Sequence, residues 1–156
     1  MQSTQQQDTG QVRIVRTYRV APEKIWRAWT EPQALSQWFA PGKNLDSTEA
    51  EIDLRVGGRY RIAFQAPNGE THEASGVYEV VEPNKRLVFS WGWKGTPERI
   101  SRISIELKSV SQGTEQGTEL NFVHDRFFDT AARDNHERGW QSFFVNLGDF
   151  LQAEPV

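Results

Sequence analysis

The apolar positions of this chain change their spacing several times between residues 12 and 152. At first they alternate with polar positions, as Val12, Ile14 and Tyr18 show, which is typical of a strand with one buried face. The next segment, APEKIWRAWTEPQALSQWF, has its apolar residues at helical spacing, and its proline suits a first helical turn. Pro32 interrupts the pattern, so we expect two short helices here instead of one long helix.

The middle of the chain alternates repeatedly, which predicts consecutive antiparallel strands. The first of these strands is STEAEIDL, and the second has Tyr60 and Phe64 on one face and ends before Asn68-Gly69, a strong hairpin signal. Gly57-Gly58 precedes this strand and predicts a bulge or a tight bend. Further along, the segment SQGTEQGTE predicts an expanded hairpin loop. The apolar faces of the later strands are Leu87, Phe89, Trp91 and Trp93, then Ile103, Ile105 and Leu107, then Leu120, Phe122 and His124.

A long helix is predicted from about Thr130 to Gln152, with Asp129 as its N-cap. Gly139 interrupts this helix, and a glycine inside a helix costs about 0.5–1 kcal/mol relative to alanine. A glycine on the solvent face, or a bend that leaves room beneath the helix, would explain it, but we expect close approach of a neighbouring backbone. The apolar face of the helix consists of Trp140, Phe143, Phe144, Leu147, Phe150 and Leu151.

This order of elements predicts an α+β fold: one strand, two short helices, about six further strands and a long C-terminal helix. The alternation favours an antiparallel sheet with one covered face, and only the helices can cover it. The length of 156 residues indicates a single domain, which we assign to residues 11–153. Residues 1–10 are polar and rich in glutamine, so we expect a disordered tail there.

Charge and composition argue against several classes of function. A net charge of -3 and a pI near 5.7 are unlike a nucleic-acid binder, which is normally basic. The sequence has no apolar run long enough for a membrane span and no secretory signal at its start, so we expect a cytoplasmic protein. The absence of cysteine excludes disulfides and thiolate chemistry.

Aromatic residues are the unusual feature of the composition, with six tryptophans and nine phenylalanines that can build a core or line an apolar pocket. The histidines, His72, His124 and His136, lack the spacing of metal ligands, and no catalytic or cofactor motif is present. His124 shares an inward face with Phe122, where it could bond backbone or water, contact a ligand, or act as an acid or base. Arg16 interrupts the first strand and could form a structural ion pair or anchor an anionic ligand.

Five segments in order cover nearly all of residues 12–152: RTYRVAPEKIWRAWTEPQALSQWFAP, DLRVGGRYRI, GVYEVVEPNKRLVFSWGW, GTELNFVHDRF and GWQSFFVNLGDFL. Together they resemble the activator-of-heat-shock-protein-ATPase homologue (AHSA-type) family, within the START-like (SRPBCC) superfamily of polyketide cyclases and birch-pollen allergens. The resemblance implies the helix-grip (START-like) fold: a curved antiparallel sheet of about six or seven strands, wrapped on a long C-terminal helix with a cavity between them.

The resemblance also implies a small binding protein that holds a hydrophobic or amphipathic molecule in that cavity, in a role related to stress. No catalytic residue, metal or cofactor is expected. A cyclase-like or other small-molecule enzyme and a regulator of a ninety-kilodalton heat-shock ATPase stay open, although residues 1–11 are too short for the additional N-terminal domain of eukaryotic activators. A chaperone contact and a homodimer stay open too. The expected ligand-binding residues, the first two of them at the entrance, are Trp38, Phe39, Tyr60, Phe64, Phe89, Trp91, Trp93, Phe122, His124, Trp140 and Phe144.

Overall fold

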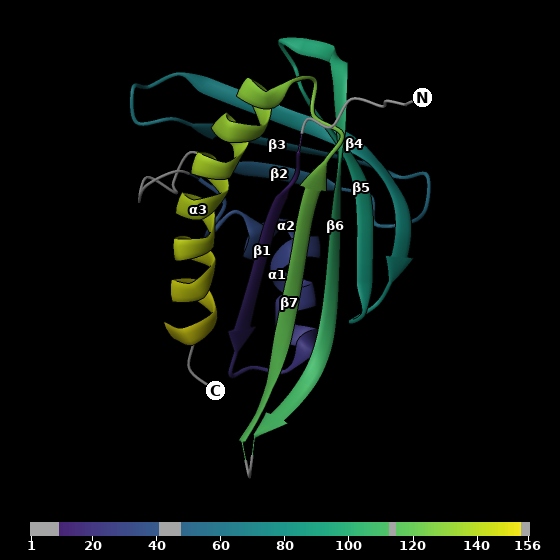
Figure 1. The fold of residues 1–156 in the computed structure, drawn as a ribbon, viewed down its shortest axis with the longest axis vertical. Helices are drawn as coiled ribbons and strands as arrows, with labels where there is room; N and C mark the ends of the chain where they lie inside the picture. The colour runs from purple at the N-terminus through teal and green to yellow at the C-terminus, as the bar shows by residue number, and fades with distance from the viewer. Residues whose placement is uncertain (1–9, 41–47, 113–114, 154–156) are drawn as a thin grey trace, which may run out of the picture.

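The computed structural model describes residues 10–40, 48–112 and 115–153, so the predicted tail lies outside the described residues except for Gly10. The predicted fold class is confirmed: a curved antiparallel sheet wraps on a long C-terminal helix, and two short helices follow the first strand (Figure 1). The seven strands are ordered β1-β7-β6-β5-β4-β3-β2. In chain order the elements are β1 (Val12–Tyr18), α1 (Pro22–Thr30), α2 (Pro32–Leu35), β2 (Glu49–Ile52), β3 (Arg59–Gln65), β4 (Thr71–Glu82), β5 (Arg86–Trp93), β6 (Thr96–Gln112), β7 (Glu115–Asp125) and α3 (Thr130–Ala153).

Curvature of the sheet makes the space that α3 occupies. Strands β2 and β3 run almost across the direction of β6 and β7, and α3 lies beside β1 (Figure 1). The predicted bend before β3 is confirmed, because Gly57 has a positive φ of 86°. A Cβ at Gly58 would lie 2.1 Å from the carbonyl oxygen of Asp53, so only glycine fits this close approach.

The two hairpin predictions had different outcomes. Asn68-Gly69 does turn the chain between β3 and β4, and Gly69 has a φ of 91°. The expanded loop predicted over SQGTEQGTE is wrong, because β6 and β7 stay paired as far as Gln112 and Glu115. The ladder is made by backbone hydrogen bonds, which small polar residues form as well as apolar ones, so the missing apolar alternation concealed the strand ends.

Prolines open both short helices, as the sequence predicts, with Pro22 in the first turn of α1 and Pro32 in the first turn of α2. The buried face of α1 includes Trp29. Trp38 follows α2 and is fully buried, and its indole nitrogen donates to the carbonyl oxygen of Ala28 at 3.0 Å. This bond ties the segment after α2 to α1 and satisfies a donor that burial would otherwise leave unpaired.

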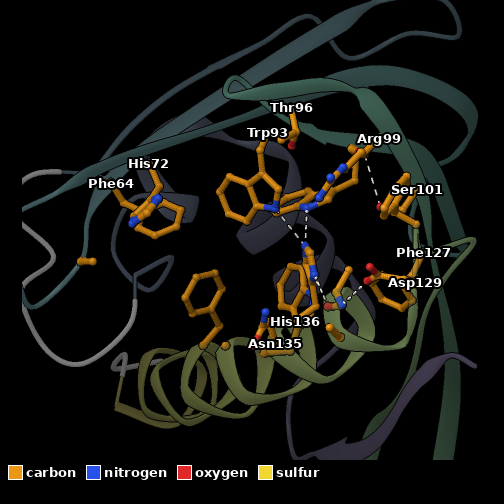
Figure 2. A pocket seen from close by; sticks show the side chains of 18 residues that line it. Phe64, His72, Trp93, Thr96, Arg99, Ser101, Phe127, Asp129, Asn135 and His136 are labelled. Atoms are coloured by element: carbon orange, nitrogen blue, oxygen red, sulfur yellow. Dashed lines mark hydrogen bonds between the residues drawn. The ribbon is translucent and has the colours of Figure 1, made fainter. Parts of the chain in front are cut away.

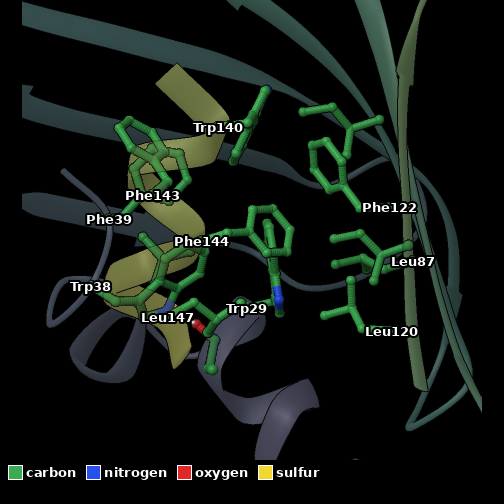
Figure 3. Close-up of a cluster of buried hydrophobic side chains, with 14 of the residues drawn as sticks. Trp29, Trp38, Phe39, Leu87, Leu120, Phe122, Trp140, Phe143, Phe144 and Leu147 are labelled. Atoms are coloured by element: carbon green, nitrogen blue, oxygen red, sulfur yellow. Dashed lines mark hydrogen bonds between the residues drawn. The ribbon is translucent and has the colours of Figure 1, made fainter. Parts of the chain in front are cut away.

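The core lies between α3 and the concave face of the sheet (Figure 3). The ring centroid of Phe122 lies 4.6 Å from that of Trp140 and 5.2 Å from that of Phe144. Trp29 of α1 adds a fourth ring, whose centroid lies 6.1 Å from that of Phe122. Interlocked rings of this kind bury large apolar areas, so the predicted helical stripe does pack on the sheet.

The start of α3 confirms one prediction and corrects another. Asp129 caps the helix as predicted, since its Oδ1 accepts a hydrogen bond from the backbone nitrogen of Ala132 at 2.8 Å. The expected close approach at Gly139 is wrong, because a Cβ there would meet no neighbouring atom within 4 Å. The alternative of room beneath the helix fits instead, since Gly139 borders a cavity.

Candidate functional site

A cavity of about 550 Å³ lies between the first turns of α3, the loop before this helix and the ends of strands β3 to β6. Figure 2 shows Trp93, Thr96 and Arg99 on the sheet side, with Asn135 and His136 across from them on α3. A volume of this size is typical of sites for small molecules. The lining residues are Phe64, Ala66, His72, Trp91, Trp93, Thr96, Arg99, Ser101, Phe127, Phe128, Asp129, Ala131, Ala132, Asn135, His136, Gly139, Trp140 and Phe143.

The wall is largely aromatic because the inward-facing residues of β5 and the inner face of α3 both contribute aromatic side chains to it. Trp91 and Trp93 stand two residues apart on β5 and therefore share its concave side, while Phe143 comes from the inner stripe of α3. The ring centroids of the two tryptophans are 5.2 Å apart at nearly a right angle, and Phe64 meets Phe143 at 5.5 Å in the same edge-to-face manner. Because each ring is held by its neighbour, the cavity has a preformed apolar surface.

His136 fixes the orientation of both tryptophans on β5. Its Nδ1 lies 2.7 Å from the carbonyl oxygen of Ala132, which can only accept, so Nδ1 carries the proton. Its Nε2 therefore accepts, and the indole nitrogens of Trp93 and Trp91 donate to it at 2.9 and 3.3 Å (Figure 2). Burial lowers the pKa of His136, which favours this neutral form.

His124 lies directly behind this wall and is fully buried, which confirms its predicted inward orientation. The indole nitrogen of Trp140 donates to its Nδ1 at 3.0 Å, so the proton of the neutral ring is on Nε2. Nε2 lies 2.7 Å from Oγ of Ser101, and that hydroxyl donates to the carbonyl oxygen of Trp91 at 3.3 Å. Burial, and next the nearby His136, lower the pKa of His124 well below its usual value.

Ser101 and His124 lie as close together as a serine nucleophile and its general base, but here the histidine donates the hydrogen bond to the serine. A general base must accept the serine proton on an unprotonated ring nitrogen. Here the nitrogen that faces Ser101 carries a proton, because Trp140 occupies the other nitrogen as a donor. The pair therefore acts as a hydrogen-bonded support for Trp91 and Trp140 and not as a catalytic dyad.

Polar groups are concentrated at the mouth of the cavity. The Arg99 guanidinium carbon lies 3.9 Å from the centroid of the Phe128 ring, and Phe128 is 59% exposed, unusually open for a phenylalanine. Thr96 and Asn135 add a hydroxyl and an amide to the lining. Asp129 also borders the cavity, but one of its oxygens caps α3.

The structure divides the predicted ligand-binding residues into two groups. Four line the cavity: Phe64, Trp91, Trp93 and Trp140. The other seven are buried in the core and do not border this cavity: Trp38, Phe39, Tyr60, Phe89, Phe122, His124 and Phe144. Trp38 and Phe39 are less than 2% exposed, so they lie in the core and not at an entrance. Direct ligand contact by any of these residues stays a prediction.

Several lining residues are not among the predicted ligand-binding residues. Phe143 and Gly139 carried a usable signal, since both belong to the α3 segment around the predicted stripe. Arg99 and Phe128 carried none, because nothing local indicates that a strand residue and a loop residue meet. Arg16, the cation that the sequence did single out, is exposed on β1, and its guanidinium donates to the carbonyl oxygen of Val15 at 3.1 Å.

Two further findings concern the part of the chain that the structure describes. Within residues 10–40, 48–112 and 115–153, no group of three or more histidine, aspartate or glutamate side chains could hold a metal ion. No helix among these residues is long and apolar enough to cross a membrane.

Residues 19–152 match the family model described as Activator of Hsp90 ATPase homolog 1-like protein. Among curated proteins, no sequence is similar enough to count as a relative. Solved structures do resemble the fold. Protein CV1439 from Chromobacterium violaceum is 26% identical with a TM-score of 0.76, over 93% of this chain and 99% of that one.

Two other solved structures show the same architecture. The AHSA1 (SPO3351) protein from Silicibacter pomeroyi is 23% identical with a TM-score of 0.74, over 94% of this chain and 100% of that one. CalU16 from Micromonospora echinospora is 26% identical with a TM-score of 0.69, over 94% of this chain and 76% of that one.

Proposed function

Because the chain belongs to the Activator of Hsp90 ATPase homolog 1-like family, whose fold leaves a cavity beside its last helix, we propose that it binds a small apolar or amphipathic molecule there. The observation that carries this proposal is the aromatic cavity of about 550 Å³. Aromatic rings line this space, and a guest would cover the apolar surface that they still expose to it.

The hydrogen bonds around the cavity support binding over catalysis. His136 uses both ring nitrogens to hold Ala132, Trp91 and Trp93, so it has no acceptor left for a substrate proton. His124 uses both of its nitrogens as well. Groups that are fully engaged with their neighbours stabilise the shape of a wall, and a preformed wall reduces the entropy that binding costs.

Gly139 supports the same proposal. It borders the cavity, and an added Cβ would meet no neighbouring atom within 4 Å, so the missing side chain keeps space open next to Trp140. The helix accepts a residue that weakens it by about 0.5–1 kcal/mol relative to alanine. A binding site is a physical reason for a helix to keep such a residue.

The test is a titration with N-phenyl-1-naphthylamine, a neutral aromatic probe that fluoresces in apolar surroundings. We expect binding with a Kd of about 1 μM or tighter, equivalent to about -8 kcal/mol. Gly139→Leu should fill part of the cavity and weaken binding at least about tenfold, since four added carbons occupy space that the guest needs. Gln141→Leu, an exposed position on the same helix, is the matched control and should bind as the parent does. A failure of the parent to bind, or equal binding by Gly139→Leu, would overturn the proposal.

The family description names an activator of the Hsp90 ATPase, and a chaperone contact is therefore the second candidate. Stoichiometric recovery of Hsp90 with the purified protein, together with faster ATP hydrolysis, would favour it. Binding of the neutral probe without any effect on that ATPase would favour the ligand-binding role.

A further inference from the structure

The mouth of the cavity carries a cation, Arg99, that donates no hydrogen bond to any residue that the structure describes. Arg99 lies near the start of β6, in the lining, with its side chain 45% exposed. Its Nε lies 3.8 Å from Oε2 of Glu98, which makes a loose ion pair, and its guanidinium lies over the face of the Phe128 ring. Among the described residues, no atom accepts a hydrogen bond from this guanidinium, which has five N–H donors.

Phe128 holds this cation at the mouth. It comes from the loop between β7 and α3, and its ring lies under the guanidinium at 3.9 Å. Stacking on an aromatic face covers one side of the planar guanidinium and leaves the N–H groups at its edge available. An exposed phenylalanine that borders the same cavity would also contact the apolar part of a guest.

Among the described residues that line the cavity, Arg99 is the one arginine or lysine, and the other titratable groups differ from it in chemistry or position. Asp129 has one oxygen occupied by the backbone nitrogen of Ala132. His72 lies 3.8 Å from Glu70, on the opposite side of the cavity from Arg99 in Figure 2. His136 is neutral and is bonded on both nitrogens.

We propose that Arg99 selects the ligand class: an amphipathic acid whose carboxylate or sulfonate is held by the Arg99 guanidinium at the mouth, and whose apolar body lies among the aromatic rings. This inference rests on the proposed function and deepens it. The guanidinium fork matches two oxygens of one anionic group, and a charge-assisted bond of this kind is stronger than a neutral one. Thr96, also in the lining, places a hydroxyl near the same end of the cavity.

The experiment compares two probes with one aromatic skeleton, neutral N-phenyl-1-naphthylamine and 8-anilino-1-naphthalenesulfonate, which adds a sulfonate. We expect the parent protein to bind the sulfonate more tightly. Arg99→Gln should weaken the sulfonate about tenfold, a value near the low end for a charged hydrogen bond because the site is partly exposed, and should change the neutral probe less than about twofold. Arg86→Gln is the matched control, since Arg86 carries the same charge, is 39% exposed and lies at the far end of β5, outside the lining.

Thermal melting checks that each variant is folded, and salt provides a second measurement on the parent alone. Raising the salt concentration from about 0.05 M to about 0.5 M should weaken the sulfonate and leave the neutral probe unchanged, because salt screens an exposed ion pair. The role of Arg99 is overturned if the neutral probe binds but Arg99→Gln has the same ratio of affinities for the two probes as the parent. It is also overturned if that ratio does not change with salt in the parent. In both cases the proposed function stands. If neither probe binds the parent, both proposals fail.

Discussion

Replacing Gly139 by alanine should make the protein more stable, because this half-buried residue of α3 has open space around it. Gly139 lies inside α3, and its φ is outside the left-handed region, so alanine needs no change of backbone. A Cβ would meet no neighbouring atom within 4 Å, so it adds no clash and almost no new packing. The effect then reduces to helix propensity and the lower entropy of the unfolded chain, about 0.5–1 kcal/mol in favour of the variant.

A second glycine in the same helix supplies the control. A Cβ at Gly148 would lie 3.8 Å from Cε1 of Tyr18, which is ordinary van der Waals contact. Gly148→Ala should therefore stabilise by the same amount or slightly more, because its methyl group gains a partner. The two variants should differ in binding, since only Gly139 borders the cavity.

Urea denaturation at neutral pH measures the free energy of unfolding, and a melting experiment should show a rise in Tm of about 1–4 °C for a chain of this size. Titration with the neutral naphthylamine probe measures binding, which Gly139→Ala should weaken modestly and Gly148→Ala should leave unchanged. A Gly139→Ala variant that is less stable than its parent would refute the reasoning, because it would mean that the position is not open.

Two further predictions concern the buried histidines and their neighbours. Burial lowers the pKa of His124 and His136, so below about pH 6.5 the unfolded chain binds protons that the folded chain does not. The free energy of unfolding should therefore be highest above that pH. It should fall as the pH drops, by at most about 1.4 kcal/mol per pH unit for each histidine. Urea titrations between pH 7 and pH 5 would show this slope, and a flat profile would contradict it. Phe122→Ala should lose about 3–5 kcal/mol of stability through cavity formation, and His124→Ala about 1–3 kcal/mol, because Trp140 Nε1 would keep no acceptor. The reverse order in urea denaturation would show that the bond between Trp140 and His124 contributes more than the packing of Phe122.

The local pattern of the chain was enough to predict most elements. Each buried face follows a local period. On β3, β5 and β7 the residues of one face lie two positions apart, and on α3 they lie three or four positions apart. Turn chemistry was equally local, as Gly57-Gly58 and Asn68-Gly69 illustrate. The pattern failed at residues 111–112 and 115–119, where the ladder is built from small and polar residues that carry no periodic signal.

The site depended on tertiary structure. Trp91 and Phe122 both point to the concave side, and so do Trp140 and Phe144 on α3, yet only Trp91 and Trp140 border the cavity. The difference depends on how far the curved sheet lies from the first turns of α3. That separation involves residues far apart in the chain, so the pattern of one short segment does not predict it.

The sequence by itself determined which residues are buried and which class of fold they build, because burial is repeated with the period of each element. The tertiary structure alone decided which buried rings touch each other and which face open space. It also brought Arg99 of β6 to the ring of Phe128 beyond β7, through the pairing of two long strands and the loop that follows them. Contacts between residues far apart in the chain depend on the register and curvature of the sheet, which are properties of all seven strands together.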